Sequence, residues 1–256
     1  MSMFAALDIY HDLSARAAAM NMAIDEALLE YATLPCIRFY RWHSPALSFG
    51  YFGKFAHVAC YAGERDLVRR WTGGGIVFHG EDLTYSIVVS ANDSVFGESS
   101  VTIYERVHRA LCDALNSNGE RAVVAGGVDP GGIAVARQAM RDERRYSEKG
   151  DLPWQIARRR TGERRWLASD CFANPVRADV MVDGHKIAGA AQRRTRRGLL
   201  QQGSIQGVDL ENGLAERFAV ELSNNCQPRS LPKAVQCRAG EIAAQKYGAD
   251  AWLRKR

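Results

Sequence analysis

Residues 68–80 read VRRWTGGGIVFHG and place three consecutive glycines between a basic stretch and a β-branched run. Because glycine has no Cβ, a peptide group there can come very close to another chain or to a ligand. The surrounding segments are rich in β-branched and aromatic residues, which favour strands: CIRFYRWH (36–43), ALSFGY (46–51), DLVRRW (66–71) and LTYSIVVS (83–90). We therefore predict that the glycines lie in a connection between strands.

Helical periodicity appears on either side of these strands. Apolar residues recur at helical spacing over 14–33, with Ser14 as a predicted N-cap, and again over 102–117, where Thr102 and Glu105 have capping-box spacing. Shorter helices are predicted over 211–222 and 239–247. Between the second and third helices, the segments 176–182, 185–195 and 199–206 indicate an antiparallel meander with an Asp-Gly turn at 183–184. This order predicts an α+β fold with a mainly antiparallel sheet flanked by helices.

One segment interrupts this pattern. Residues 126–170 are punctuated by glycine and proline, and residues 137–166 hold ten lysines and arginines against five acidic residues. We expect a mobile, arginine-rich loop or lid here. A second basic run, RRTRR (193–197), suits an acidic partner.

Composition excludes several classes of protein. The 256 residues are 46% hydrophobic and 25% charged, with a net charge of +5, as in ordinary soluble globular proteins. No apolar stretch is long enough to cross a membrane and no signal peptide is evident, so we expect a cytoplasmic protein without a membrane partner. The six cysteines form no CxxC pair or Cys/His cluster, which argues against a zinc site and a disulfide scaffold.

The flanks of the glycine triplet suggest a kind of ligand. Alone, such a triplet is most often a plain turn. Here Arg69 and Arg70 supply cationic donors before it, and residues 76–78 (IVF) supply an apolar surface after it. That combination suits a ligand with a polar head and a hydrocarbon tail.

Several motifs together resemble one known family. They are MNMAIDEALLE, RFYRWHSPALSFGYF, RRWTGGGIVFH, LTYSIVVS and DGHKIAGAAQRRTRRGLLQQGSI, in this order between about Met20 and about Ile205. They resemble the lipoate–protein ligase A and octanoyltransferase family, which shares its catalytic fold with biotin protein ligases. The resemblance implies one catalytic domain over residues 1–256. We expect no separate C-terminal accessory domain, because only about 50 residues follow Ile205.

The resemblance also implies roles for individual residues. Lys186 matches the catalytic lysine of the family, whose ammonium group would stabilise the negative charge that develops on the acyl oxygen. Without the resemblance, it would be interpreted as a surface lysine after a turn. The implied substrate-binding residues, which include the border of an acyl tunnel, are Arg70, Thr72, Gly73, Gly74, Gly75, His79, Gly189, Ala190, Gly203 and Ser204.

Cys171 is the candidate nucleophile. It lies in the stretch DCFANP (170–175), fifteen residues before Lys186, and this stretch resembles the cysteine-bearing loop of the octanoyltransferase branch. A thiolate is the attacking species, and nearby cations would increase the thiolate fraction. The alternative is that Cys171 is a small buried hydrophobic residue, which is the commoner role of a free cysteine.

The leading functional hypothesis is transfer of an octanoyl or lipoyl group from an acyl carrier protein thioester, through Cys171, to a lysine of a lipoyl domain or of the glycine-cleavage H protein. This route needs no cofactor. An ATP-dependent lipoate–protein ligase, which would use ATP and Mg²⁺, is the first alternative. An amidotransferase and a non-catalytic acyl-binding protein are further alternatives. Nucleic-acid binding is not expected, because no aromatic residues alternate with the arginines of RRTRR.

Overall fold

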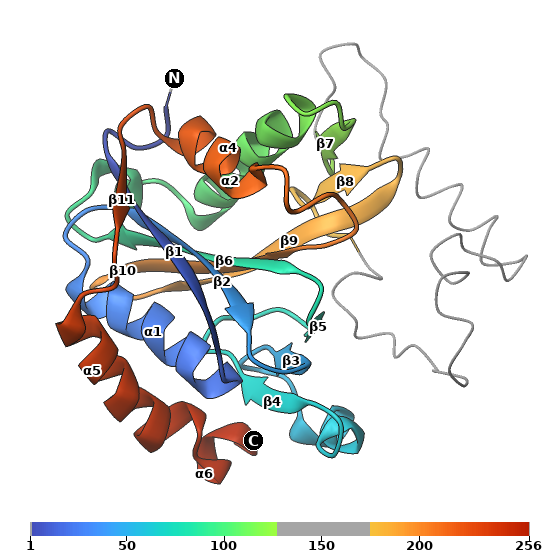
Figure 1. Cartoon of the computed structure of the whole chain (residues 1–256), viewed down its shortest axis with the longest axis vertical. Coiled ribbons are helices and arrows are strands. Elements are labelled where there is room, and N and C mark those ends of the chain that lie inside the picture. Colours follow the sequence, from blue (N-terminus) through green and yellow to red (C-terminus); the bar gives the residue numbers. More distant parts are fainter. Residues whose placement is uncertain (1, 127–174, 256) are drawn as a thin grey trace, which may run out of the picture.

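The computed structural model describes residues 2–126 and 175–255, and these form two sheets with helices packed around them (Figure 1). In the described residues, the larger sheet has eight strands in the order β11-β1-β2-β6-β10-β9-β8-β7. Neighbours are antiparallel, except that β1 runs parallel to both β2 and β11. The strands are β1 (Leu7–Arg16), β2 (Cys36–Trp42), β6 (Leu83–Ser90), β7 (Ala122–Val124), β8 (Val180–Val182), β9 (His185–Arg194), β10 (Gly198–Ile205) and β11 (Cys226–Arg229).

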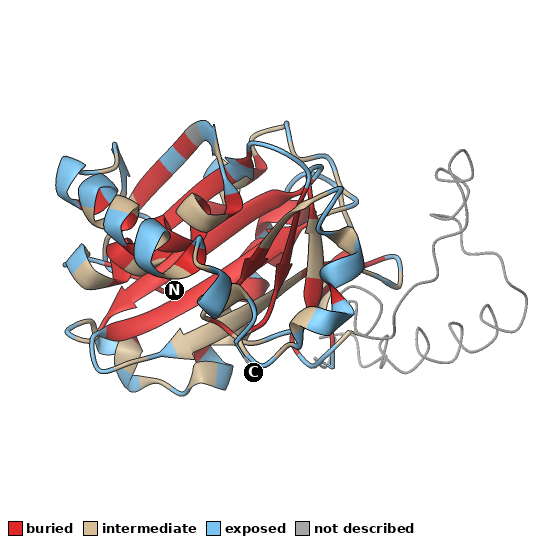
Figure 2. Cartoon of the chain, turned by 90° about the horizontal axis from the view of Figure 1, so that it is seen from below, coloured by how far each residue is buried: buried red, intermediate tan, exposed pale blue. Residues whose placement is uncertain are grey.

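Helices cover both faces of this sheet, which explains why β6 and β10 are buried along their whole length (Figure 2). On one face, α2 (Ser100–Asn116) and α4 (Leu214–Leu222) pack against apolar side chains such as Ile37 and Ile87. On the other face, α1 (Ala18–Tyr31) packs against Tyr40 and Val88, and α5 (Lys233–Ile242) packs on α1. Two hydrophobic cores therefore sandwich the sheet.

The smaller sheet carries the glycine triplet. Its three strands, in the described part of the chain, are β4 (Asp66–Arg69), β3 (Ala46–Phe49) and β5 (Ile76–His79), in that spatial order. Residues 70–75 connect β4 to β5, so the glycines lie between strands as predicted. After α5, a π-helical turn (Ala243–Tyr247) packs on α1 and leads to α6 (Asp250–Leu253), which lies beside β4.

The predicted fold class is confirmed, but several element boundaries were wrong. Strand β1 extends to Arg16, so Ser14 is not an N-cap, and α1 begins after Ala17 without a side-chain cap. Helix α2 is capped by Ser99, whose hydroxyl accepts from the Thr102 amide, three residues before the predicted cap. The last predicted helix, over 239–247, is in fact the second half of α5 followed by the π-helical turn.

Strands β1, β5, β7 and β11 escaped the sequence analysis. Three of them have at most four residues, too few to show a periodicity. The predicted loop or lid over 126–170 lies outside the described residues, except for Gly126. Among the described helices, none is long and apolar enough to span a membrane.

Candidate functional site

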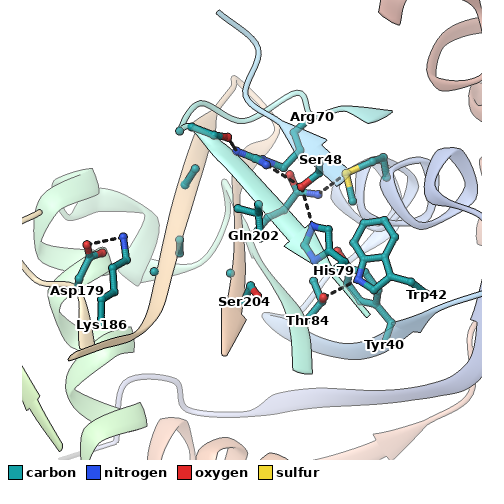
Figure 3. A pocket seen from close by; sticks show the side chains of 18 of the residues that line it. Tyr40, Trp42, Ser48, Arg70, His79, Thr84, Asp179, Lys186, Gln202 and Ser204 are labelled. Atoms are coloured by element: carbon teal, nitrogen blue, oxygen red, sulfur yellow. Dashed lines mark hydrogen bonds and ion pairs between the residues drawn. The ribbon is translucent and has the colours of Figure 1, made fainter. Parts of the chain in front are cut away.

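A cavity of about 280 Å³ lies where the two sheets meet (Figure 3). The smaller sheet contributes β3, β5 and the glycine loop to its wall, and the larger sheet contributes β9, β10 and the ends of β2 and β6. The described residues that line it are Met22, Tyr40, Trp42, Ser48, Arg70, Gly74, Gly75, Val77, His79, Thr84, Val176, Asp179, Lys186, Gly189, Ala190, Ala191, Gln202, Gly203 and Ser204.

The glycine loop packs directly on the end of β3. A Cβ on Gly50 would lie 2.1 Å from the carbonyl oxygen of Gly74 and 2.6 Å from that of Gly73, so only glycine fits at position 50. Gly74 has a φ of 85°, in the left-handed region that glycine adopts without strain. Arg70 closes the loop by donating to the carbonyl oxygens of Gly73 at 3.0 Å and Gly75 at 2.8 Å.

The two adjacent arginines before the loop have different tasks. Arg70 faces the cavity, whereas the side chain of Arg69 is buried and donates to backbone carbonyls at both Tyr51 and Lys255. Arg69 therefore attaches the C-terminal segment to the smaller sheet, and only one of the two predicted cationic donors reaches the site.

His79 links Arg70 to a buried carboxylate. The Ser48 hydroxyl accepts from Arg70 at 2.7 Å and lies 2.7 Å from Nε2 of His79. On its other side, Nδ1 of His79 lies 2.8 Å from the carboxylate of Asp82. The ring also stacks on Trp42, with 4.0 Å between the centroids. These contacts fix the orientation of the imidazole in the wall of the cavity.

Asp82 is the fixed charge at the end of this chain of hydrogen bonds. Burial alone would raise its pKa, but His79 and the hydrogen bonds from His79, Thr84 and the Gly80 amide outweigh burial and lower the pKa to about 2. Ser204, one of the predicted binding residues, also donates to this carboxylate at 2.8 Å. Asp82 is therefore ionised throughout the physiological range.

A second polar network lies beneath the cavity. Gln202 accepts from the Thr72 hydroxyl at 2.8 Å and donates to Asp25 at 2.8 Å. Asp25 and Arg38 are both fully buried and joined at 2.8 Å. Because both ends of its amide are occupied, Gln202 presents a fixed surface to the cavity.

Lys186 lies in the opposite wall, on β9. Its Nζ is 2.7 Å from Oδ2 of Asp179, and both side chains are almost completely buried. The side chain extends over Gly189, where a Cβ would meet Cε of Lys186 at 2.7 Å and Nζ at 2.9 Å. Gly189 thus leaves room for the lysine and its carboxylate partner to lie flat against the strand.

The structure brings together most of the residues proposed from sequence. Nine of them line the cavity, namely Arg70, Gly74, Gly75, His79, Lys186, Gly189, Ala190, Gly203 and Ser204. Thr72 and Gly73 do not line it. The Thr72 hydroxyl donates to the lining residue Gln202, and the Gly73 carbonyl is turned toward Arg70 and Gly50. Cys171 lies outside the described residues.

Sequence reasoning missed Ser48, Asp82, Asp179 and Gln202. Each is a polar residue within or beside a strand. Only the pairing of strands shows that Ser48, Asp179 and Gln202 face the cavity, and that Asp82 lies behind it against His79 and Ser204. For Gln202 the sequence did offer a signal: it lies two residues before Ser204, and alternate residues of a strand face the same side. Within the described residues, no group of three metal-ligating side chains is close enough to hold an ion.

The lining of the cavity suits a ligand with a polar head and a hydrocarbon tail. Apolar side chains, including Met22 and Val77, line part of it, while Arg70 and Lys186 bring positive charge to its walls. A hydrocarbon chain can be buried there with a carbonyl group near an ammonium ion, which stabilises negative charge on the carbonyl oxygen.

Solved structures of other proteins share this fold. The fold matches a lipoate–protein ligase A bound with ATP, with a TM-score of 0.66 at 18% identity over 98% of this chain and 99% of the other. It also matches a structure from an archaeal lipoylation system, described as a bipartite lipoate protein ligase and its E2 lipoyl domain from Thermoplasma acidophilum, with a TM-score of 0.64 at 18% identity over 98% and 96% of the chains. At this identity the match concerns the fold alone.

Residues 17–235 match the family model described as the lipoyl protein ligase A/B catalytic domain. The chain belongs to this family, which confirms the resemblance seen in the sequence motifs. Among curated proteins, it is 34% identical to the octanoyltransferase LipM of Oceanobacillus iheyensis over 90% of this chain and 76% of the relative. It is 33% identical to the LipM of Geobacillus kaustophilus over 77% of this chain, and that alignment spans only 63% of the relative's length.

Proposed function

We propose that this protein transfers an octanoyl group from a carrier-protein thioester to a lysine of a lipoyl domain or of the glycine-cleavage H protein, through a thioester on Cys171. The relatives that share about a third of its residues are named octanoyltransferases. A structural relative belongs to a lipoylation system described with its E2 lipoyl domain, which makes such a domain the acceptor to test. The chain would act as a single catalytic domain.

The reaction has two acyl-transfer steps. In the first, the Cys171 thiolate attacks the thioester carbonyl, its sulfur becomes bonded to the acyl carbon, and the carrier leaves as a thiolate that takes up a proton. In the second, the neutral amine of the acceptor lysine attacks the same carbon and the nitrogen gives up one proton to solvent. The carbon–sulfur bond breaks, an amide forms and Cys171 leaves as a thiolate. Both steps exchange acyl bonds and need no ATP.

The observation that carries this proposal is the cavity with Lys186 in one wall and Arg70 beside the glycine loop in the other. Each step passes through a tetrahedral intermediate with a negative oxygen. The Lys186 ammonium is already oriented by Asp179, so it can stabilise this charge without reorganisation during the reaction. The remaining apolar wall, which includes Met22 and Val77, would bury the hydrocarbon tail.

The test is intact-protein mass spectrometry after mixing the protein with octanoyl carrier protein in the absence of ATP. We expect the mass of one octanoyl group to be added, and we expect hydroxylamine to remove it. The Cys171→Ser variant should acquire no hydroxylamine-labile adduct, and Cys226→Ser, at a partly buried cysteine outside the cavity, serves as the control.

One result would replace this proposal. If no adduct forms, and a lipoyl domain is modified only when free lipoate and ATP are supplied, the protein is an ATP-dependent lipoate–protein ligase. Cys171 would then be dispensable and Lys186 would remain essential.

A further inference from the structure

The carboxylate that holds Lys186 is itself held by helix α2. Asp179 accepts from the Tyr104 hydroxyl at 2.7 Å through Oδ1, and from the Val176 amide at 2.7 Å through Oδ2, the oxygen that also contacts Lys186. The Tyr104 oxygen in turn accepts from the Ala190 amide at 3.0 Å. A single hydroxyl thus connects the partner of Lys186 to the backbone of β9 in the cavity wall.

The turn that carries Asp179 has an unusual backbone. Ala178 is buried and has a φ of 69°, a left-handed conformation that costs free energy in any residue with a Cβ. Hydrogen bonds hold it on two sides: its amide donates to Ala125 at 2.8 Å, and its carbonyl accepts from Nδ1 of His108. This conformation directs the Asp179 carboxylate toward Lys186.

The hydrogen bonds to Asp179 and to the carbonyl of Ala178 come from one face of α2. Tyr104 and His108 are four residues apart, and their rings touch with 4.2 Å between the centroids. Neither residue lines the cavity. Burial and the neighbouring Asp179 raise the pKa of Tyr104 far above its ordinary value, so the hydroxyl keeps its proton and remains a donor.

We propose that Tyr104 is a positioning residue for Lys186: its hydroxyl, acting through Asp179, fixes the ammonium group in the wall of the cavity. This inference rests on the proposed function, in which Lys186 stabilises the charge on the acyl oxygen. Tyr104 does not touch the substrate, and its effect on the reaction comes only from the place that it gives to Lys186.

The chain contains a matched control. Tyr247 is also buried and also donates to a carboxylate that contacts a lysine: its hydroxyl is 2.6 Å from Glu26, and Lys246 is 2.6 Å from the same oxygen. Neither Tyr247 nor Glu26 lines the cavity. Tyr104→Phe and Tyr247→Phe therefore remove the same kind of hydrogen bond, one at the site and one away from it.

The experiment measures steady-state octanoyl transfer to a lipoyl domain by the full chain. For Tyr104→Phe, we expect kcat to fall by about 10-fold or more, with KM for the octanoyl carrier within about twofold of the parent, because a displaced ammonium weakens binding of the transition state. Tyr247→Phe should leave both parameters within about twofold. Thermal unfolding of both variants sets an assay temperature at which each is folded.

A double-mutant cycle tests whether Tyr104 affects kcat through Asp179 or only through the general stability of the fold. If Tyr104 acts through Asp179, adding Tyr104→Phe to Asp179→Asn should lower kcat by less than about twofold further. Equal kcat values for Tyr104→Phe and Tyr247→Phe, or effects of Tyr104→Phe and Asp179→Asn that multiply, would overturn the inference. A Lys186→Ala variant with full activity would instead refute the role of the lysine in the proposed function.

Discussion

At the scale of single residues, the site depends on where a side chain is missing. A Cβ on Gly189 would lie 2.7 Å from Cε and 2.9 Å from Nζ of Lys186, so the lysine would have to move. The atoms that would clash are the last two of a flexible side chain, which can swing away, whereas the strand around them is rigid. The absence of a side chain at position 189 therefore affects the place of the ammonium more than the stability of the fold.

This separation can be tested with Gly189→Ala. We expect transfer activity to fall by about 100-fold, as when a catalytic group is displaced by about 1 Å, and the free energy of unfolding to change by less than about 1 kcal/mol. Gly63→Ala is the control, because a Cβ at Gly63 would meet nothing within 4 Å. The measurements are kcat/KM and urea unfolding, and a large loss of stability in Gly189→Ala would contradict this reasoning.

At the scale of elements, the glycine triplet is defined as much by β3 as by a ligand. The loop carbonyls of Gly73 and Gly74 lie against the backbone at Gly50, at the end of β3, while Arg70 donates to the carbonyls of Gly73 and Gly75. No described atom lies within 4 Å of a Cβ placed on Gly73. Glycine is therefore required at position 50, where the loop contacts the strand, whereas at position 73 there is room for a side chain.

Two substitutions test which of these positions requires glycine. Gly50→Ala forces a Cβ into rigid backbone and should destabilise the protein by about 1–3 kcal/mol, with a loss of activity as the loop shifts. Gly73→Ala should leave the midpoint of urea unfolding almost unchanged. If Gly73→Ala proves the more destabilising of the two, the loop is not supported by β3 in the way described.

At the scale of the whole molecule, buried ionisable groups make stability depend on pH. Burial lowers the pKa of His108 to about 4, from an ordinary value near 6.5, so the folded protein keeps this imidazole neutral. Its Nδ1 proton is then available for Ala178, while Nε2 accepts from Tyr85 at 3.1 Å. The unfolded chain binds a proton at this histidine more readily than the folded protein does.

Acid should therefore weaken the fold in a defined window. The contribution of His108 is complete above about pH 6.5 and is lost as the pH falls toward 4, by on the order of 3 kcal/mol in total. Asp82, with a pKa of about 2, extends the loss to lower pH. Urea unfolding between pH 7 and 4 should show this slope in the parent and in a variant of the exposed His57, His57→Gln, and a flatter slope in His108→Gln; equal slopes would contradict it.

The sequence was sufficient to predict the fold class, which depends on local patterns. It also gave about half of the described residues that line the cavity, and these followed from the family resemblance. Strand and helix periodicities identified the longer elements, and the family motifs RRWTGGGIVFH and DGHKIAGAAQRRTRRGLLQQGSI identified nine lining residues. Asp179, Ser48 and Tyr104 were not predictable in the same way. Each acquires its role from a partner distant in the chain, and the left-handed Ala178 that directs Asp179 has no signature in a residue type that usually favours helices.

The order of strands in the larger sheet has a consequence for how the chain acquires its structure. The central strand β6 (Leu83–Ser90) pairs on one side with β2 and on the other with β10 (Gly198–Ile205), and residues 127–174 lie between these partners in sequence. During synthesis, the edge of β6 that pairs with β10 has no partner until β10 has left the ribosome. Such late, long-range closure makes folding slow, and it makes β6 the apolar segment that most needs protection from other chains in the meantime.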